Sequence, residues 1–223
     1  MSQPILTDAE LDYTIGLARK GDVVAFNRLV ERFQRDLFTV ALRIVGDSDE
    51  AADMTQEAII AALHGLPRFK GGNFRVWLLR IVTNQCLDYL RARKRHTHVS
   101  LDAITEAGEE WNTPLAVEGN PMVLFEQQEL RELLQQALLA LPTEQRVAII
   151  LSDIEGLHYD EIAQVTQTQL GTVKSRIARG RLRLQQYLLQ QQELLPRTYR
   201  HITQNDPSHH QTESAIPADR DDA

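Results

Sequence analysis

The chain has 223 residues, of which 43% are hydrophobic and 25% charged, and its formal net charge is −7. It is long enough for one large or two small folded units with apolar cores. A run of about 18 apolar residues, the length that a bilayer span needs, does not occur in it. The amino end, MSQPILTDAELD, also lacks the basic start and apolar core of a secretory signal. We therefore expect a cytoplasmic protein without direct membrane insertion.

Reactive and metal-binding side chains are scarce. The single cysteine, Cys86, cannot form an internal disulfide, and its apolar helical surroundings predict a buried structural thiol. The adjacent His209 and His210 lie in a polar tail and do not define a metal site. The sequence also has no glycine-rich phosphate loop and no nucleophile elbow. We expect no metal, no cofactor, no small-molecule substrate and no enzymatic activity.

The first half of the chain carries helical periodicity and no alternating strand pattern, which predicts an all-α fold. Between residues 24 and 45 the apolar side chains recur every three or four positions, as on one face of an amphipathic helix. A second helix is expected over about 49–66 and a third from near Asn73. The intervening LPRFKGGN contains a proline and a glycine pair, which predict a loop.

Residues 96–123 differ in composition from both flanks. They are rich in threonine, glutamate, glycine and asparagine and have no apolar period, which is typical of a linker. If flexible, roughly 30 such residues would hold two domains about 30 Å apart on average. We therefore expect two small helical domains, residues 1–95 and 124–195. A flexible acidic linker, residues 96–123, joins them, and a disordered acidic tail, residues 196–223, follows the second.

Charge is segregated along the chain in spite of the acidic total. Residues 68–95 carry eight basic side chains against one acid, and residues 171–183 carry five basic side chains and no acid. The segments 7–57 and 100–132 have an excess of acids instead. Because long-range fields follow clusters rather than the sum, the two basic segments predict contacts with a polyanion.

The carboxyl-terminal domain reads as a helix-turn-helix. After a predicted turn near Glu155 come a short helix over 159–165, a tight turn and a long helix. In such motifs the second helix enters the major groove of DNA. Val173 and Ile177 form its expected inward stripe, and Thr168 is its expected N-cap.

The outward face of this long helix is basic. Arginine can make two hydrogen bonds to a guanine edge, and lysine and hydroxyl groups reach bases or phosphates. Gly180 costs the helix about 1 kcal/mol relative to alanine, and we interpret it as a close-packing or tolerated site rather than a helix stop. The outward positions predicted to face DNA are Lys174, Ser175, Ala178 and Arg179 near the front of the helix, with Arg181 and Arg183 further on.

The other basic segment, residues 68–95, interleaves cations with aromatic side chains. Sites for single-stranded nucleic acid use this combination, because aromatic rings stack on bases while cations follow the phosphates. Phe74 and Trp77, at helical spacing, also fit a hydrophobic core, so both interpretations stay open for them.

The order of these features resembles a known family. DEAADMTQEAIIAAL, FKGGNFRVWLLRIVTNQCLDYLRARKR, an acidic linker and LPTEQRVAIILSDIEGLHYDEIAQVTQTQLGTVKSRIARGRLRL together resemble the extracytoplasmic-function (ECF, group IV) sigma factors of bacterial RNA polymerase, over about residues 18–187. The resemblance implies a region 2 bundle and a region 4 helix-turn-helix. It also implies a non-enzymatic subunit that binds core polymerase and directs it to promoters.

The resemblance assigns partners to particular residues. Asp53, Gln56 and Glu57 match the helix that docks on the clamp coiled coil of the largest polymerase subunit, and the surface over 141–154 would meet the flap. The acidic linker is implied to thread the active-centre cleft. Region 4 implies recognition of the −35 element, with contacts from Thr172, Lys174, Ser175, Arg176, Arg179 and Arg183. Contacts to the −10 element are implied for Phe69, Lys70, Asn73, Arg75, Trp77, Arg80, Asn84 and Arg91.

An anti-sigma factor is a further implied partner, and it could hold the protein at the membrane. This chain has Gln167 and Gln169 where the family usually has glycine and proline, which predicts a turn with positive φ. Ala178 replaces a larger side chain that is often present, so the preferred −35 sequence stays open. The alternative is a stand-alone helix-turn-helix regulator with an amino-terminal sensor or dimerisation domain, which would leave the 68–95 segment unexplained.

Overall fold

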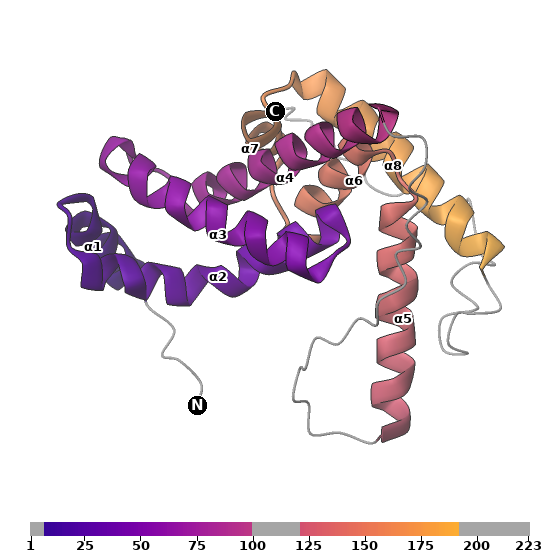
Figure 1. Ribbon diagram of the computed structural model, residues 1–223, viewed down its shortest axis with the longest axis horizontal. Helices are drawn as coiled ribbons and strands as arrows, with labels where there is room; N and C mark the ends of the chain where they lie inside the picture. The colour runs from indigo at the N-terminus through magenta and orange to yellow at the C-terminus, as the bar shows by residue number, and fades with distance from the viewer. Residues whose placement is uncertain (1–6, 100–120, 192–223) are drawn as a thin grey trace, which may run out of the picture.

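The computed structural model describes residues 7–99 and 121–191, and every regular element within them is helical (Figure 1). The amino-terminal bundle comprises α1 (Asp8–Arg19), α2 (Val23–Val45), α3 (Ser48–Gly65), the short turn η1 (Leu66–Arg68) and α4 (Phe74–Val99). The carboxyl-terminal bundle comprises α5 (Pro121–Leu139), α6 (Thr143–Ile149), the π-helical turn η2 (Ile150–Ile154), α7 (Tyr159–Thr166) and α8 (Leu170–Gln190). The expected all-α fold is confirmed. The expected tail and most of the expected linker lie outside the described residues.

Local signals set the boundaries of the first helices. The Asp22 carboxylate caps α2 by accepting a backbone N–H at 3.0 Å, and α2 ends at Gly46, whose φ of 89° favours glycine. Asp47 caps α3 in the same way, at 2.8 Å. A capping box between Thr7 and Glu10 begins α1, a helix that the sequence analysis did not predict. No helix within the described ranges is long and apolar enough to cross a bilayer.

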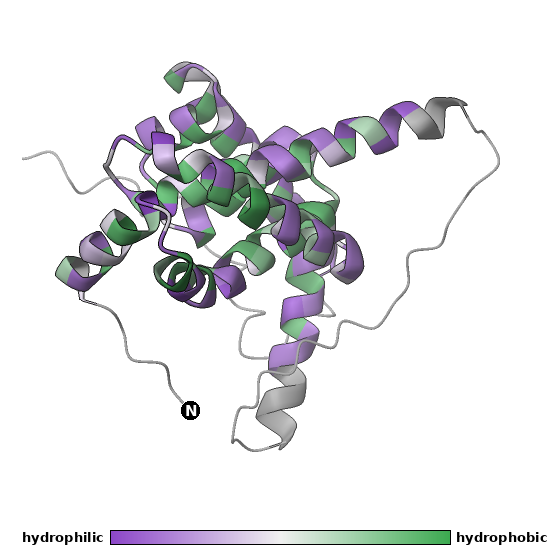
Figure 2. Ribbon diagram, turned by 60° about the vertical axis from the view of Figure 1, so that its left-hand side comes forward, coloured by the Kyte–Doolittle hydropathy of each residue, from purple (hydrophilic) through white to green (hydrophobic). Residues whose placement is uncertain are grey.

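The core of the amino-terminal bundle lies between α2, α3 and α4. Leu29, Val40 and Ile44 of α2 and Leu79 and Val82 of α4 are each no more than 2% exposed. Figure 2 shows hydrophobic residues gathered where the helices meet and hydrophilic ones on the outside. Burying one such side chain contributes about 1.5 to 3 kcal/mol, so this layer makes a large contribution to the stability of the bundle.

Cys86 of α4 lies in this core and is fully buried, as predicted. Burial raises the pKa of its thiol to about 12. Because the thiolate is the reactive form, we expect Ellman's reagent at pH 8 to label the native protein at least about 100-fold more slowly than the urea-unfolded protein. Similar rates in the two states, followed by absorbance, would contradict a stably packed α4.

The carboxyl-terminal bundle packs α8 against α6 and α7. Val173 and Ile177 are 1% and 2% exposed, which confirms the inward stripe of the long helix, and Ile162 of α7 is fully buried beside them. Gly180 is buried too, and a Cβ atom placed on it would lie 2.7 Å from Cγ1 of Ile149. The interpretation of this glycine as a close-packing site is confirmed.

Replacing Gly180 with alanine should therefore destabilise the protein in spite of the better helix propensity of alanine. Overpacking against Ile149 costs about 1 to 3 kcal/mol, against a propensity gain of about 1 kcal/mol. The matched control is Gly171→Ala in the first turn of the same helix, where a Cβ would meet nothing within 4 Å. We expect urea unfolding to give a lower midpoint for Gly180→Ala and a higher one for Gly171→Ala. Two variants of equal stability would refute the packing argument.

The two bundles pack directly against each other. α7 contacts α4, and both α5 and α6 contact α2 (Figure 1). The side chain of Gln135 on α5 donates a hydrogen bond to the Leu42 carbonyl at 3.1 Å. In this structure the two domains are in contact, closer together than the average of about 30 Å that a flexible linker alone would give. Linker composition sets only how far apart the domains can move, whereas complementary faces decide whether they touch.

Candidate nucleic-acid and partner interfaces

An exposed polar face runs along α3. Asp53, Gln56 and Glu57 are all exposed, and their spacing of three and four positions places them on one side of the helix. Ala58 and Ala62, which face the core, are each 1% exposed. The structure thus brings together the three residues predicted to dock on a protein partner.

Two large apolar side chains continue this face. Ile60 follows Asp53 by seven positions and Leu63 follows Gln56 by seven, and they are 45% and 46% exposed. Residues seven apart lie two turns along the same side of a helix. The sequence analysis did not select Ile60 and Leu63, although apolar residues outside the buried period of a helix are a usable signal. Exposed apolar side chains beside polar ones are typical of a docking surface.

A polar stripe runs along α4. Trp77, Arg80, Asn84 and Arg91 are spaced by three, four and seven positions, so they lie on one side of the helix. Arg80 and Arg91 are exposed, while Trp77 and Asn84 are partly buried. Arg91 donates to Asp88 at 2.7 Å, an exposed pair that water and salt weaken. Four of the eight residues predicted for the −10 element therefore share one surface.

Arg75 lies away from this stripe. Its Nη2 is 2.5 Å from Oε2 of Glu155, which belongs to the carboxyl-terminal bundle. Its Nη1 also donates to the Glu155 carbonyl at 3.2 Å. In this arrangement the Arg75 side chain links the amino-terminal bundle to the carboxyl-terminal bundle.

The aromatic residues at the start of α4 form a cluster. The ring centroids of Phe69 and Trp77 are 5.1 Å apart, and Phe74 lies within 5.4 Å of both. Phe69 and Phe74 are 7% and 4% exposed, so the core interpretation holds for Phe74. The predicted contacts of Phe69 and Trp77 with DNA stay predictions. A base could stack on the buried Phe69 ring only after the loop moves.

This cluster anchors the loop that precedes α4. Gly71 and Gly72 both have φ of 94°, a conformation that suits glycine. Lys70 and Asn73 are exposed, and the Asn73 side chain accepts the backbone N–H of Val76 at 3.2 Å. The loop is thus held at both ends and presents its polar residues to solvent.

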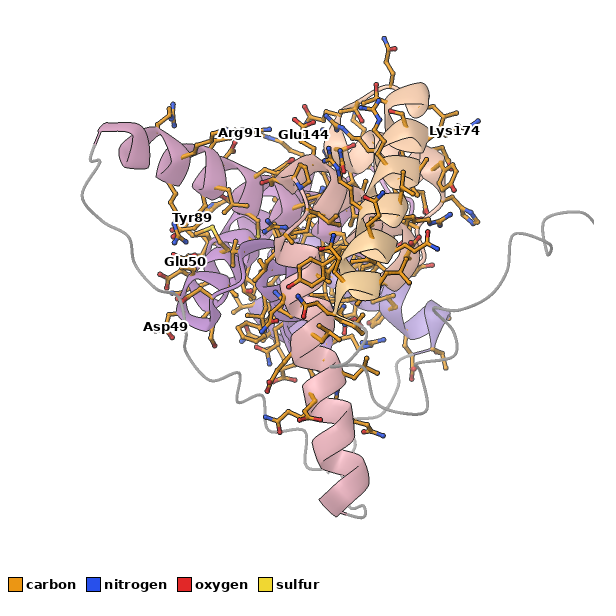
Figure 3. The ribbon with its side chains drawn as sticks, turned by 90° about the vertical axis from the view of Figure 1, so that its right-hand side faces the viewer. Asp49, Glu50, Tyr89, Arg91, Glu144 and Lys174 are labelled. Atoms are coloured by element: carbon orange, nitrogen blue, oxygen red, sulfur yellow. The ribbon has the colours of Figure 1, made fainter. Side chains whose placement is uncertain are left out.

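One ion pair links α3 to the far end of α4. Nη1 of Arg93 donates to both carboxylate oxygens of Glu50, at 2.9 and 3.0 Å. Figure 3 shows Tyr89 and Glu50 close together, and burial followed by its hydrogen bond to Glu50 raises the pKa of Tyr89. These contacts couple the orientation of the polar stripe to that of α3.

α7 and α8 form the predicted helix-turn-helix. Gln167 has φ 53° and ψ 42°, which confirms the expected positive φ. α8 begins at Leu170 with Gln169 as its N-cap, so the predicted capping role of Thr168 is wrong. The Thr168 hydroxyl lies instead 2.9 Å from the Thr166 hydroxyl. The positive φ shifts the helix start by one residue and leaves that threonine inside the turn.

Lys174 and Arg179 are the free cations of α8. Both are exposed, and neither makes an ion pair or hydrogen bond through its side chain within residues 7–99 and 121–191. Figure 3 shows Lys174 at the outer edge of the helix. Ser175 and Thr172 are partly buried, and the Ser175 hydroxyl donates to the Thr172 carbonyl at 2.9 Å.

The other arginines of α8 point toward α6 and η2 of the same bundle. They pair as Arg176 with Glu144, Arg181 with Asp153 at 2.7 Å, and Arg183 with the Gln145 side chain at 3.1 Å. The hydrogen bonds from Arg181 lower the pKa of Asp153. Of the predicted DNA contacts, Arg176 and Arg183 would have to exchange these partners for a phosphate or base, whereas Lys174 and Arg179 are already available.

Two family models match the chain in the order of its domains. Residues 29–96 match Sigma-70 region 2, and residues 131–184 match Sigma-70 region 4. The first match covers the polar faces of α3 and α4, and the second covers the helix-turn-helix.

Curated relatives agree with these matches. The chain is 38% identical over 178 residues to the ECF RNA polymerase sigma-E factor of Escherichia coli strain K12, with 79% of this chain and 91% of the relative covered. It is 37% identical over 164 residues to the ECF RNA polymerase sigma factor SigE of Mycolicibacterium smegmatis. That match covers 74% of this chain and 62% of the relative.

Two solved complexes have a similar fold. The sigma factor RpoE bound to the anti-sigma factor NepR from Bartonella quintana has a TM-score of 0.60 at 27% identity, covering 74% of this chain and 98% of that one. CnrH bound to the cytosolic domain of CnrY has a TM-score of 0.55 at 25% identity, covering 79% and 95%. By its two domain matches and its extended identity to the curated relatives, the chain belongs to the family of extracytoplasmic-function RNA polymerase sigma factors.

Proposed function

We propose that this protein binds core RNA polymerase and directs it to promoters by contacting the −10 and −35 elements. One observation supports the proposal above all: the structure has three exposed surfaces that differ in chemistry and lie on different helices of a sigma-factor fold. These are the acidic and apolar face of α3, the polar stripe of α4 and the free cations of α8. A protein that positions polymerase on DNA needs one protein-binding face and two DNA-binding faces.

Each surface suits the partner that we assign to it. Asp53 and Glu57, beside the apolar Ile60, complement a polymerase surface that presents arginines and apolar groups. Asn84, flanked by Arg80 and Arg91, combines an amide that can read a base edge with cations that follow phosphates. Lys174 and Arg179 reach the major groove when α8 lies in it, as a recognition helix does.

We further propose that the protein carries no catalytic residue of its own, acts in the cytoplasm and is controlled by an anti-sigma factor. The last point draws on the similarity to two sigma factors that were solved with such partners. An anti-sigma factor that covered Ile60 and Leu63 would block polymerase docking directly.

Run-off transcription with purified core polymerase tests the proposed function. Genomic fragments are transcribed with core alone and with core plus this protein. We expect promoter-dependent transcripts in the second reaction, and co-elution of the protein with core on gel filtration. A protein that binds DNA tightly alone but never associates with core would instead be a stand-alone regulator.

A further inference from the structure

One acidic side chain interrupts the basic segment of α4. Asp88 is the single acid among residues 68–95, which carry eight basic side chains. It follows Asn84 by four positions and precedes Arg91 by three, so it lies on the side of the helix that carries the polar stripe. Its side chain is 71% exposed. The surface that we propose for the −10 element therefore presents a carboxylate to solvent.

A carboxylate on a surface that binds DNA weakens the binding that does not depend on sequence. Cations that neutralise phosphates supply that part of the affinity, and a like charge facing the phosphates opposes it. The fold gives little reason for an acid at this position. Within the described residues the one charged partner of Asp88 is Arg91, and water and salt weaken such an exposed pair. The acid therefore calls for an explanation in terms of DNA.

Arg91 orients the Asp88 carboxylate. Nη1 of Arg91 donates to Oδ1 of Asp88 at 2.7 Å. A carboxylate accepts hydrogen bonds at both oxygens, and Oδ2 has no partner within residues 7–99 and 121–191. The guanidinium likewise keeps Nη2 and Nε for a phosphate. The pair thus offsets the charge of the acid and leaves one acceptor oxygen open to a base.

The open oxygen can distinguish between bases. A carboxylate accepts a hydrogen bond from the N4 amino group of cytosine. Thymine and guanine present keto oxygens at the corresponding edge, and adenine places the N7 acceptor beside its amino group, so a carboxylate is repelled there. Repulsion of the wrong base adds to the attraction of the right one. The chemistry of Asp88 therefore favours cytosine.

The spacing along α4 limits where this base lies. Four residues of a helix rise about 6 Å, and successive bases of a stacked strand are about 3.4 Å apart. We propose that Asp88 selects a cytosine one or two positions from the base that Asn84 contacts, and that Arg91 is its positioning residue. This inference rests on the proposed function for the presence of promoter DNA on α4. It adds a preferred base and the residue that selects it.

Transcription of a promoter library tests the assignment. Core polymerase and the full-length protein transcribe templates that are randomised around the −10 element, and sequencing compares run-off transcripts with the input. For the wild type we expect cytosine to be favoured about tenfold at one position. For Asp88→Ala this preference should fall below about twofold. The yield from templates with thymine or guanine there should rise, because the repulsion is gone.

Two conservative variants give results that a purely structural role would not produce. An amide can both donate and accept, which suits N6 and N7 of adenine, so Asp88→Asn should move the preference from cytosine to adenine at the same position. Arg91→Lys keeps the charge but loses the planar fork that orients the carboxylate. It should reduce the cytosine preference only in part, with other positions unchanged.

Two controls separate base selection from general charge. Glu31→Ala removes an acid from an exposed position on α2 of the same bundle, and every base preference should stay as in the wild type. Arg95→Ala removes an exposed cation seven positions after Asp88 on the same side of α4. If Arg95 contacts only phosphate, all templates should lose yield alike and no preference should change.

The outcomes distinguish this inference from the proposed function. A wild type that transcribes the library without a cytosine preference would overturn the role of Asp88 and leave the proposed function intact. The same holds for an Asp88→Ala variant that keeps the preference, or that changes every position equally. A wild type that gives no promoter-dependent transcript would reject the proposed function, and this inference with it.

Discussion

Replacing Arg179 with alanine should reduce transcription from a −35-dependent promoter about tenfold while leaving core binding unchanged. Arg179 is exposed on α8 and makes no side-chain pair within the described residues, so its guanidinium is free for DNA. A bidentate arginine contact to a base contributes about 1 to 3 kcal/mol, which sets the size of the loss. Run-off transcript yield under limiting sigma factor measures it.

Arg181→Ala is the matched control for this experiment. It removes the same charge from the same helix two residues later, but Arg181 is directed at Asp153 and not at the free face. We expect less than a twofold loss of transcripts for this variant. Equal losses for the two variants would mean that α8 acts through its overall charge, and the assignment of Arg179 as a reading residue would be rejected.

The sequence predicted well where one local feature decides the outcome. Gly180 was interpretable because few other reasons place glycine inside a helix, and Ile149 supplies the close contact. The positive φ at Gln167 was implied by the glycine that the resembling family usually has there, and the periods of α2 and α8 followed from their apolar residues. Each of these properties depends on a few neighbours in the chain.

Prediction from the sequence was weaker where residues outside the local pattern determine the role of a side chain. Thr168 has the chemistry of an N-cap, but the turn at Gln167 moves the helix start past it. Arg176 reads as a DNA contact from sequence alone, yet Glu144, far away in the chain, engages it. Contact between the bundles depends on the shape of both faces around Gly46 and Leu139, which no linear pattern records. Residue type indicates what a side chain can do, and packing decides whether it is free to do it.

Reversing the charge of Glu57 should have the opposite effect to Arg179→Ala: binding to core polymerase is weakened, while contact with DNA is unchanged. Glu57 lies on the exposed face of α3 with Asp53 and Gln56, and a lysine there would oppose a partner surface that presents arginines. Like charges across an interface cost several kcal/mol, so we expect the dissociation constant for core to rise roughly 30-fold. Biolayer interferometry on immobilised core gives this constant directly.

Glu31→Lys on α2 supplies the control, since it changes the net charge of the same bundle by the same amount at an exposed position outside the α3 face. Its dissociation constant should stay within about twofold of the wild type, because surface charges away from a contact are screened over about 8 Å at physiological salt. Ile60→Ala separates the two parts of the docking face: it should weaken core binding without altering its salt dependence, whereas Glu57→Lys should alter both. If Glu31→Lys weakens binding as much as Glu57→Lys, the acidic amino-terminal bundle steers polymerase as a whole, and α3 loses its assignment as the docking helix.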